Sequence, residues 1–152
     1  MPNSGKDLTE TSGSGDAQYL LGDQVGFFLR QANQRHVAIF TDRIGEKLTT
    51  TQWAALAKLK EMQPCSQGNL GREIAVDMAT IKGVVDRLVK RGLIRTQVDA
   101  TDARRLVLNL TDDGEQTIAR NSRAALDVSQ ETLRPLTLAE RMMLIELLKK
   151  IC

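Results

Sequence analysis

The sequence predicts a mainly α-helical protein that carries one small β-hairpin. Through most of the chain, apolar residues recur at the three- and four-residue spacing of amphipathic helices. Only residues 93–98 and 106–110 are rich in β-formers, and they flank a polar turn. The 152 residues, 41% hydrophobic and 26% charged, suit one ordinary globular unit. We expect that unit over residues 17–152, after a flexible tail rich in Gly and Ser at residues 1–16.

A long first helix is expected over residues 17–45, where Gly45 would end it. Its positions at helical spacing are Leu21, Val25, Phe28, Leu29, Ala32, His36, Ile39 and Phe40. A helix of this length presents more apolar surface than one small core needs. We therefore expect a second chain to pack against it.

The second helix is expected to begin at Thr49, because Thr49 and Gln52 have the spacing of a capping box. Pro64 would end this helix, and Ser66 is placed to cap a short third one. These helices precede the part of the chain with the most distinctive charge pattern.

A fourth helix is expected over residues 79–91, after a break at residues 75–78. Its narrow apolar stripe consists of Ile81, Val84, Val85 and Leu88. The other side carries Thr80, Lys82, Gly83, Asp86, Arg87 and Lys90. Such a stripe docks a helix by one edge and leaves the remainder in solvent.

The hairpin follows, with Leu106, Leu108 and Leu110 as the expected inward face of its second strand. Its polar turn contains Asp102, Arg104 and Arg105.

Two more helices complete the chain. Thr111 would cap the fifth, with two acids in its first turn at the positive end of the helix. Pro135 would end it, and Thr137 with Glu140 forms a second capping box that starts the last helix. We expect residues 17–45 and 112–152 to serve as dimerisation helices.

Residues 49–111 therefore contain, one after the other, a short helix, a tight turn, a half-exposed helix and a hairpin. This succession indicates a winged helix-turn-helix lobe. In such a lobe the second helix enters the major groove of DNA, with its N-terminal residues at base edges. We expect Thr80 and Lys82 to face bases. The candidates for phosphate contacts further along are Arg87, Lys90 and Arg91. A solvated helix face is the alternative explanation for these charges.

The residues of the hairpin turn favour a turn that contacts DNA over a turn that is only solvated. Arg104 has the reach and the planar head to enter a narrow minor groove, where the negative potential favours arginine. Asp102 can hold that guanidinium in one orientation or stabilise the turn. Arg105 is a phosphate contact or a solvated neighbour. A generic hairpin needs only a sequence such as Asn-Gly at this point.

These motifs resemble the MarR family of transcriptional regulators, over about residues 18–150. The strongest is Asp102-Ala-Arg104 followed by Leu110-Thr111-Asp-Asp-Gly114, which matches the wing signature of the family. The entry to the second helix of the family is similar to Leu48-Thr49-Thr-Thr-Gln52. Its recognition helix and the exit from that helix are similar to Thr80, Asp86-Arg87-Leu88 and Gly92-Leu93. The family often has Ser before the recognition-helix Thr. This sequence has Ala79 there, which puts one hydroxyl contact in doubt.

The resemblance implies a homodimeric repressor whose first and last helices interlock. Each recognition helix would read half of a palindromic operator, with half-sites about 34 Å apart. A small molecule would release the DNA. The stretch from Gln24 to His36 is similar to the first helix of relatives that control catabolism of aromatic acids or their coenzyme A thioesters, so such a compound is the expected effector.

The effector pocket of the family usually lies between the first, second and fifth helices. This points to Arg30 and His36 as partners of a carboxylate, and to Phe40 and Trp53 as contacts of the aromatic body. A lone histidine on an apolar helix face is also explained as a core or interface residue, which is the alternative for His36.

Other classes of function find little support. The chain has no Gly-rich phosphate loop, HExxH or GxSxG motif, so we expect no catalytic site, metal or cofactor. Without a targeting or membrane-spanning pattern, we expect a cytoplasmic protein with no membrane partner. Two alternatives remain open. A winged-helix lobe can bind protein instead of DNA. Oxidation of Cys65 could act as the trigger, although Cys65 and Cys152 are better explained as reduced thiols.

Overall fold

The computed structural model describes residues 18–152. The residues expected to form the flexible tail, and Ala17, lie outside this range. The described part contains helices and one two-stranded sheet, in the order η1 (Leu21–Asp23), α1 (Val25–Arg43), α2 (Thr50–Met62), α3 (Gln67–Glu73), α4 (Met78–Lys90), β1 (Ile94–Val98), β2 (Leu106–Leu110), α5 (Asp112–Thr132) and α6 (Leu138–Ile151). This is the predicted fold class, a mainly α-helical chain with a hairpin wing.

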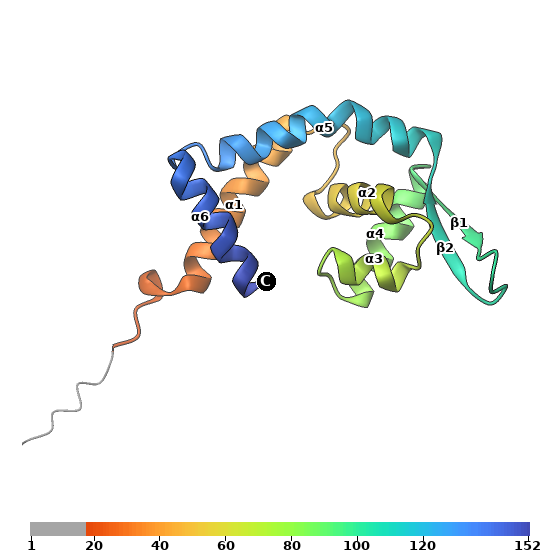
Figure 1. Cartoon of the computed structure of the whole chain (residues 1–152), viewed down its shortest axis with the longest axis horizontal. Helices are drawn as coiled ribbons and strands as arrows, with labels where there is room; N and C mark the ends of the chain where they lie inside the picture. Colours follow the sequence, from red (N-terminus) through yellow and green to blue (C-terminus); the bar gives the residue numbers. More distant parts are fainter. Residues whose placement is uncertain (1–17) are drawn as a thin grey trace, which may run out of the picture.

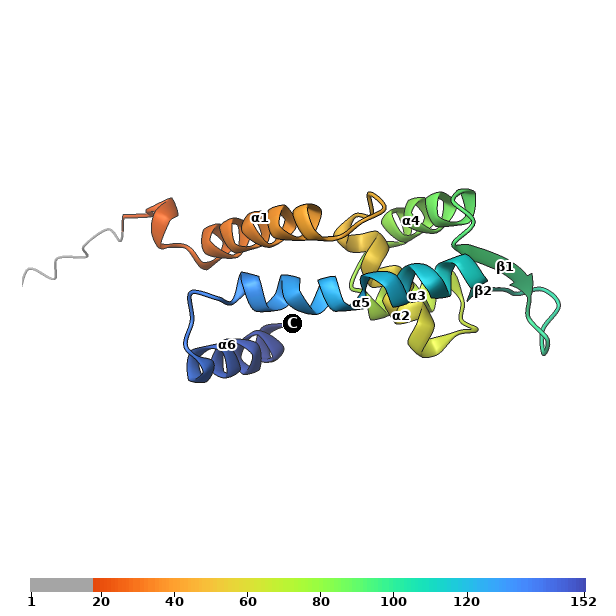
Figure 2. The same cartoon turned by 90° about the horizontal axis from the view of Figure 1, so that it is seen from above.

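Helix α5 runs through the whole molecule and connects its two ends (Figure 1). At one end it lies beside α1, and α6 folds back after it (Figure 2). At the other end it covers a compact lobe made of α2, α3, α4 and the antiparallel hairpin β1–β2. The hairpin projects from the lobe on the side away from α6 (Figures 1 and 2).

The apolar core lies mainly in this lobe and extends along the contact between α1 and α5. The largest side chains in it that are fully buried are Leu56, Leu59, Leu70, Ile81, Leu88, Ile94 and Val128. All members of the predicted α4 stripe are buried, which confirms that α4 docks by one edge. The opposite face of α4 stays in solvent.

The ends of the single chain, in contrast, leave large apolar side chains uncovered. Helix α6 has no buried residue, and α1 buries only Phe40. Exposed on η1, α1 and α6 are Leu21, Val25, Phe28, Leu29, Val37, Leu138, Met142, Met143, Ile145, Leu147 and Ile151. An apolar face of this extent marks an interaction surface.

The predicted helix caps are present. Both capping boxes form, at Thr49 with Gln52 and at Thr137 with Glu140. Ser66 accepts from the backbone N–H of Asn69, and Thr111 accepts from that of Gly114. These caps could be predicted from the sequence because a capping side chain accepts from a backbone N–H only three residues further along.

Three predictions about element boundaries and faces were wrong. Helix α1 begins at Val25 and follows the separate turn η1, rather than running from residue 17. Helix α4 begins at Met78, inside the expected break, because Asp77 caps it by accepting from the Thr80 N–H at 2.8 Å. Leu106 is not on an inward face but 61% exposed.

Leu106 is exposed because the outer end of the hairpin extends beyond the helices. It pairs with Val98, which is exposed as well, at the last register position before the turn. Val107, on the opposite face of the strand, is only 7% exposed. Further along β2, Leu108 and Leu110 are inward as predicted.

No helix in residues 18–152 is long and apolar enough to cross a membrane.

Candidate DNA interface and effector cavity

The turn of the wing is ordered by its own acids. The backbone N–H of Asp99 donates to the carbonyl of Arg105, and that of Arg105 donates to the carbonyl of Asp102, each at 2.9 Å. The Asp99 carboxylate accepts from both the N–H and the hydroxyl of Thr101. These hydrogen bonds from Thr101 lower the pKa of Asp99. The turn is therefore closed by polar contacts and not by an apolar core.

Arg104 lies at the tip of this turn with 91% of its side chain exposed. Oδ1 of Asp102 accepts from its backbone N–H at 3.0 Å and from its Nε at 3.3 Å. Asp102 thus stands where the sequence predicted it, beside the guanidinium and part of the turn. Within residues 18–152 the terminal nitrogens of Arg104 form no hydrogen bond, so they can meet an anion.

The N-terminus of α4 is held by Asp77, which the sequence interpretation did not identify. Oδ2 of Asp77 accepts from the Thr80 hydroxyl at 2.9 Å, in addition to the cap on its N–H. The hydrogen bonds from the Thr80 backbone and hydroxyl lower the pKa of Asp77. Thr80 is exposed, but its hydroxyl proton is engaged by Asp77, so toward any ligand this hydroxyl can act only as an acceptor.

Two of the remaining polar residues of α4 pair with each other. Lys82 pairs with Asp86, Nζ to Oδ2 at 2.7 Å, and both side chains are exposed. Exposed pairs of this kind contribute about 0–1 kcal/mol, so DNA can displace Asp86 from Lys82 at little cost. The Arg87 guanidinium lies over Gly83, 3.5 Å from where a Cβ would stand. Lys90 is exposed near the other end of the helix.

Arg91, the third expected phosphate contact, is exposed but already has a partner within the chain. Its Nη2 donates to the carbonyl oxygen of Glu46 at 2.7 Å, and Glu46 lies in the linker between α1 and α2. The sequence interpretation overlooked this linker, because its partners are distant along the chain.

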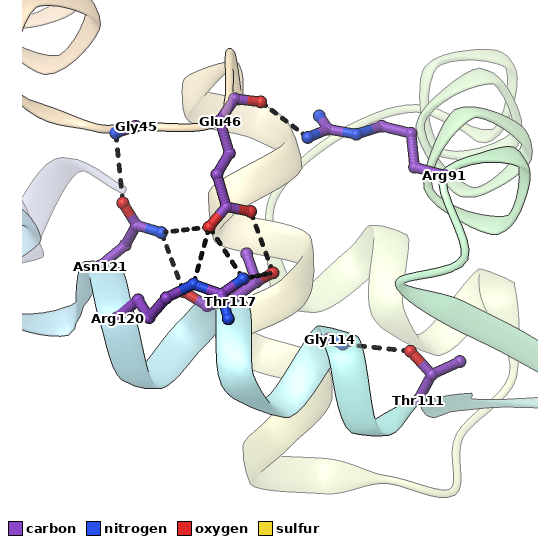
Figure 3. A network of polar contacts seen from close by, with 8 residues as sticks. All are labelled: Gly45, Glu46, Arg91, Thr111, Gly114, Thr117, Arg120 and Asn121. Atoms are coloured by element: carbon purple, nitrogen blue, oxygen red, sulfur yellow. Dashed lines mark hydrogen bonds and ion pairs between the residues drawn. The ribbon is translucent and has the colours of Figure 1, made fainter.

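The side chain of Glu46 forms the centre of a polar cluster (Figure 3). Its carboxylate accepts from the Thr117 hydroxyl at 3.0 Å, from Nε and Nη2 of Arg120 at 3.1 and 3.0 Å, and from Nδ2 of Asn121 at 3.4 Å. Oδ1 of Asn121 in turn accepts from the N–H of Gly45 at 3.2 Å. We call Gly45, Glu46, Arg91, Thr117, Arg120 and Asn121 the Glu46 junction.

The pKa of the Glu46 carboxyl and the φ angles of the linker both indicate that the junction holds Glu46 in place. Partial burial acts to raise the pKa of its carboxyl, but the hydrogen bonds from Arg120 and Thr117 outweigh it and lower the pKa overall. Glu46 and Lys47 have φ angles of 65° and 51°, in the left-handed region. For residues with a Cβ this conformation costs about 1–2 kcal/mol each, so surrounding contacts must maintain it.

Three of the predicted effector residues meet at one cavity. His36 and Phe40 of α1 and Trp53 of α2 line about 240 Å³ of space, together with Thr50, Ala54, Ala125, Val128 and Ser129. The cavity thus lies between α1, α2 and α5, as the family resemblance implied.

The orientation of His36 follows from its neighbours. The Thr132 hydroxyl donates to the carbonyl of Val128 at 2.8 Å and lies 2.9 Å from Nδ1 of His36. Since a hydroxyl has one proton, we assign the Nδ1–H of His36 as the donor to Thr132. Nε2 is then the nitrogen that is left for a ligand.

Arg30 is not brought together with these three residues in the single chain. It lines a separate cavity of about 450 Å³ near the start of α1, with Tyr19, Leu21, Gln24, Gly26, Phe27, Gln31 and Gln34. Its role as the partner of a carboxylate stays a prediction.

Comparisons with known proteins agree with this architecture. The model of the MarR family matches residues 48–106, which run from just before α2 through the turn of the wing to the first residue of β2. The HTH-type transcriptional repressor NicR of Pseudomonas putida is 36% identical over 133 residues, covering 87% of this chain and 84% of NicR. The chain belongs to the MarR family. Membership makes this MarR-family protein a transcriptional regulator and not an enzyme.

Two solved structures show the same fold over nearly the whole chain. A probable transcriptional regulator from Pseudomonas aeruginosa is 49% identical, with a TM-score of 0.85, covering 88% of this chain and 100% of that one. BpsR of Bordetella bronchiseptica, whose DNA binding is regulated by 6-hydroxynicotinic acid, is 37% identical. Its TM-score is 0.83, covering 88% of this chain and 96% of BpsR.

Oxidation of Cys65 is poorly suited to regulate this MarR-family protein. Cys65 is buried, its backbone forms a β-bridge with Leu108, and burial raises the pKa of its thiol. The protonated thiol is the unreactive form.

We expect Cys65→Ser to leave the response of DNA binding to hydrogen peroxide unchanged in a gel-shift titration, with Cys152→Ser as the matched control. A response to peroxide that disappears in Cys65→Ser alone would restore the redox alternative.

Proposed function

We propose that the protein is a homodimeric repressor that binds a palindromic operator and is released by a small aromatic acid or its coenzyme A thioester. The observation that carries the proposal is the lobe itself. An exposed polar face of α4 and a wing with an exposed, oriented Arg104 belong to one lobe of a MarR-family fold. These are the parts that a winged helix-turn-helix uses on DNA.

The dimer is supported by the uncovered apolar faces of α1 and α6. A second copy of the chain is the occupant that would cover both, because both helices lie at the end of the molecule opposite the wing, on either side of α5 (Figure 2). Two lobes related by a two-fold axis would then reach half-sites about one DNA turn, or about 34 Å, apart.

The proposed DNA contacts fall into three groups. Thr80 and Lys82 at the start of α4 face base edges, and the wing residue Arg104, held by Asp102, enters the minor groove. Phosphate contacts are assigned to Arg87, Lys90 and Arg105.

Footprinting on the DNA that flanks the coding region tests operator binding. We expect a protected palindrome, with affinity that falls at least about a thousandfold between about 50 and 200 mM salt if six or more phosphates are contacted. A shallow salt response without a footprint would favour the alternative of a protein-binding winged-helix module. Since DNA is the target, we place the protein in the cytoplasm.

The effector proposal rests on the cavity between α1, α2 and α5. It offers two aromatic side chains, and Nε2 of His36 can donate to a carboxylate when the ring is protonated. Its size suits one aromatic ring, so a coenzyme A thioester would insert only its acyl group. The regulation of the relative BpsR by 6-hydroxynicotinic acid supports a compound of this class.

Calorimetric titration with 6-hydroxynicotinic acid tests this site. We expect His36→Ala to weaken binding at least about tenfold, the loss of one charge-assisted hydrogen bond. Arg30→Ala should weaken binding of the acid but not of the corresponding amide, 6-hydroxynicotinamide, if Arg30 meets the carboxylate. Equal affinities of wild type and His36→Ala for every aromatic acid tested would contradict the proposed cavity.

A further inference from the structure

We propose that Glu46 is a positioning residue for operator binding, which sets the distance between the two recognition helices of the dimer. The inference rests on the proposed function, since it assumes a dimer that reads two half-sites. It concerns a residue that lies outside both the DNA-facing residues and the effector cavity.

The position of Glu46 in the chain is the first argument. The chain passes between the α1/α6 end and the DNA-binding lobe only twice within residues 18–152, through the linker that follows α1 and through α5 (Figure 1). The Glu46 carboxylate ties these two passages together by its contacts with Thr117, Arg120 and Asn121. A tie between them limits the rotation of the lobe about α5.

The contact with α4 is the second argument. The carbonyl of the same residue accepts from Arg91, which caps the C-terminal end of the recognition helix (Figure 3). A single residue therefore joins the linker, α5 and α4. A shift of the linker would be passed directly to the helix that is proposed to read bases.

The backbone supplies the third argument. Glu46 and Lys47 both hold left-handed φ angles, which residues with a Cβ leave when their contacts are lost. Removing the carboxylate therefore frees the linker to change its path, rather than deleting one isolated hydrogen bond. The expected consequence is a lobe that folds normally but occupies several positions relative to its partner.

Selection of DNA from a library of random duplexes tests this, because the selection itself reveals the preferred sequence and spacing. We expect the wild-type protein to enrich two half-sites at a single spacing. Glu46→Ala should enrich the same half-site sequence at two or more spacings, and should bind the wild-type spacing at least about tenfold more weakly. Its affinity for a duplex with one half-site should equal that of wild type, because Glu46 faces no DNA.

Two further variants separate positioning from folding. Arg120→Ala removes the main partner on α5, and we expect it to broaden the selected spacing in the same way. Glu61→Gln breaks an exposed pair with Lys58 in α2 and serves as the matched control, with no change expected. Thermal melting and size-exclusion chromatography check that each variant is folded and keeps the oligomeric state of wild type.

The outcomes are distinct. A single, unchanged spacing in both Glu46→Ala and Arg120→Ala would overturn the inference and leave operator binding intact. Equal weakening at every spacing and on the single half-site would also overturn it, since that is the effect of lost stability. If wild type enriches no DNA, the proposed function fails, and the positioning role with it.

Discussion

Replacing Gly114 with alanine is expected to destabilise the protein by roughly 2–4 kcal/mol, one of the largest effects available from a single methyl group. The added Cβ would overlap the backbone carbonyl oxygen of Leu93 and stand 3.2 Å from Cδ2 of Leu110. Urea unfolding followed by circular dichroism measures the change in the free energy of unfolding.

The clash at Gly114 cannot relax easily, because the Leu93 carbonyl is fixed. It accepts from the backbone N–H of Thr111 at 3.1 Å, and the Thr111 hydroxyl donates to the neighbouring carbonyl of Gly92 at 2.6 Å. The start of α5 is thereby bound to the start of β1. The glycine that closes the Leu-Thr-Asp-Asp-Gly motif is thus explained by close packing of a helix against backbone.

Gly26→Ala is the matched control for Gly114→Ala. Gly26 also lies in a helix, but nothing stands within 4 Å of the position of its Cβ. We expect a change of at most about 1 kcal/mol, in the stabilising direction, from the better helix propensity of alanine. Equal stability of Gly114→Ala and wild type would mean that α5 does not approach β1 as closely as described.

Arg104→Ala is expected to give the largest loss of DNA affinity among the wing variants, about tenfold or more on any operator-like sequence. Truncating a base- or groove-contacting arginine costs roughly 1–3 kcal/mol of binding free energy. Each lost ionic contact also reduces the slope of log affinity against log salt concentration by about 1 per protomer. Fluorescence anisotropy with a labelled duplex, at several salt concentrations, measures both quantities. The loss should be largest where the minor groove is narrow.

Two neighbouring substitutions show whether the orientation of Arg104 matters. Asp102→Ala removes the acceptor of its N–H and Nε while leaving its charge, so we expect an intermediate loss of affinity. Arg105→Ala should cost less than Arg104→Ala and weaken all sequences equally, as loss of a phosphate contact does. The proposed role of the wing would be refuted by an Arg104→Ala variant that binds DNA as wild type does.

Which parts of the site could be predicted depended on how far apart in the sequence the interacting residues lie. Asp102 and Arg104 were identified because their contact spans two residues of one turn. His36, Phe40 and Trp53 were placed together by resemblance and meet at one cavity, but Arg30 lies at another. Asp77 was overlooked, although an Asp three residues before Thr80 is a cap signal that the sequence contains.

By itself, the sequence determined the number and order of the α-helices, most of their N-terminal caps, the hairpin, and the face of α4 that is buried. Periodicity and capping are local, since each depends on residues three or four positions apart. Only the tertiary structure decided that Leu106 is exposed, that Gly114 must lack a side chain, and that Glu46 joins the linker to α5 and α4. The outcomes at Gly114 and Glu46 depend on groups that the chain brings together from about 20 to 75 residues away, and the exposure of Leu106 depends on how far the hairpin extends beyond the helices. No local pattern reports either of these.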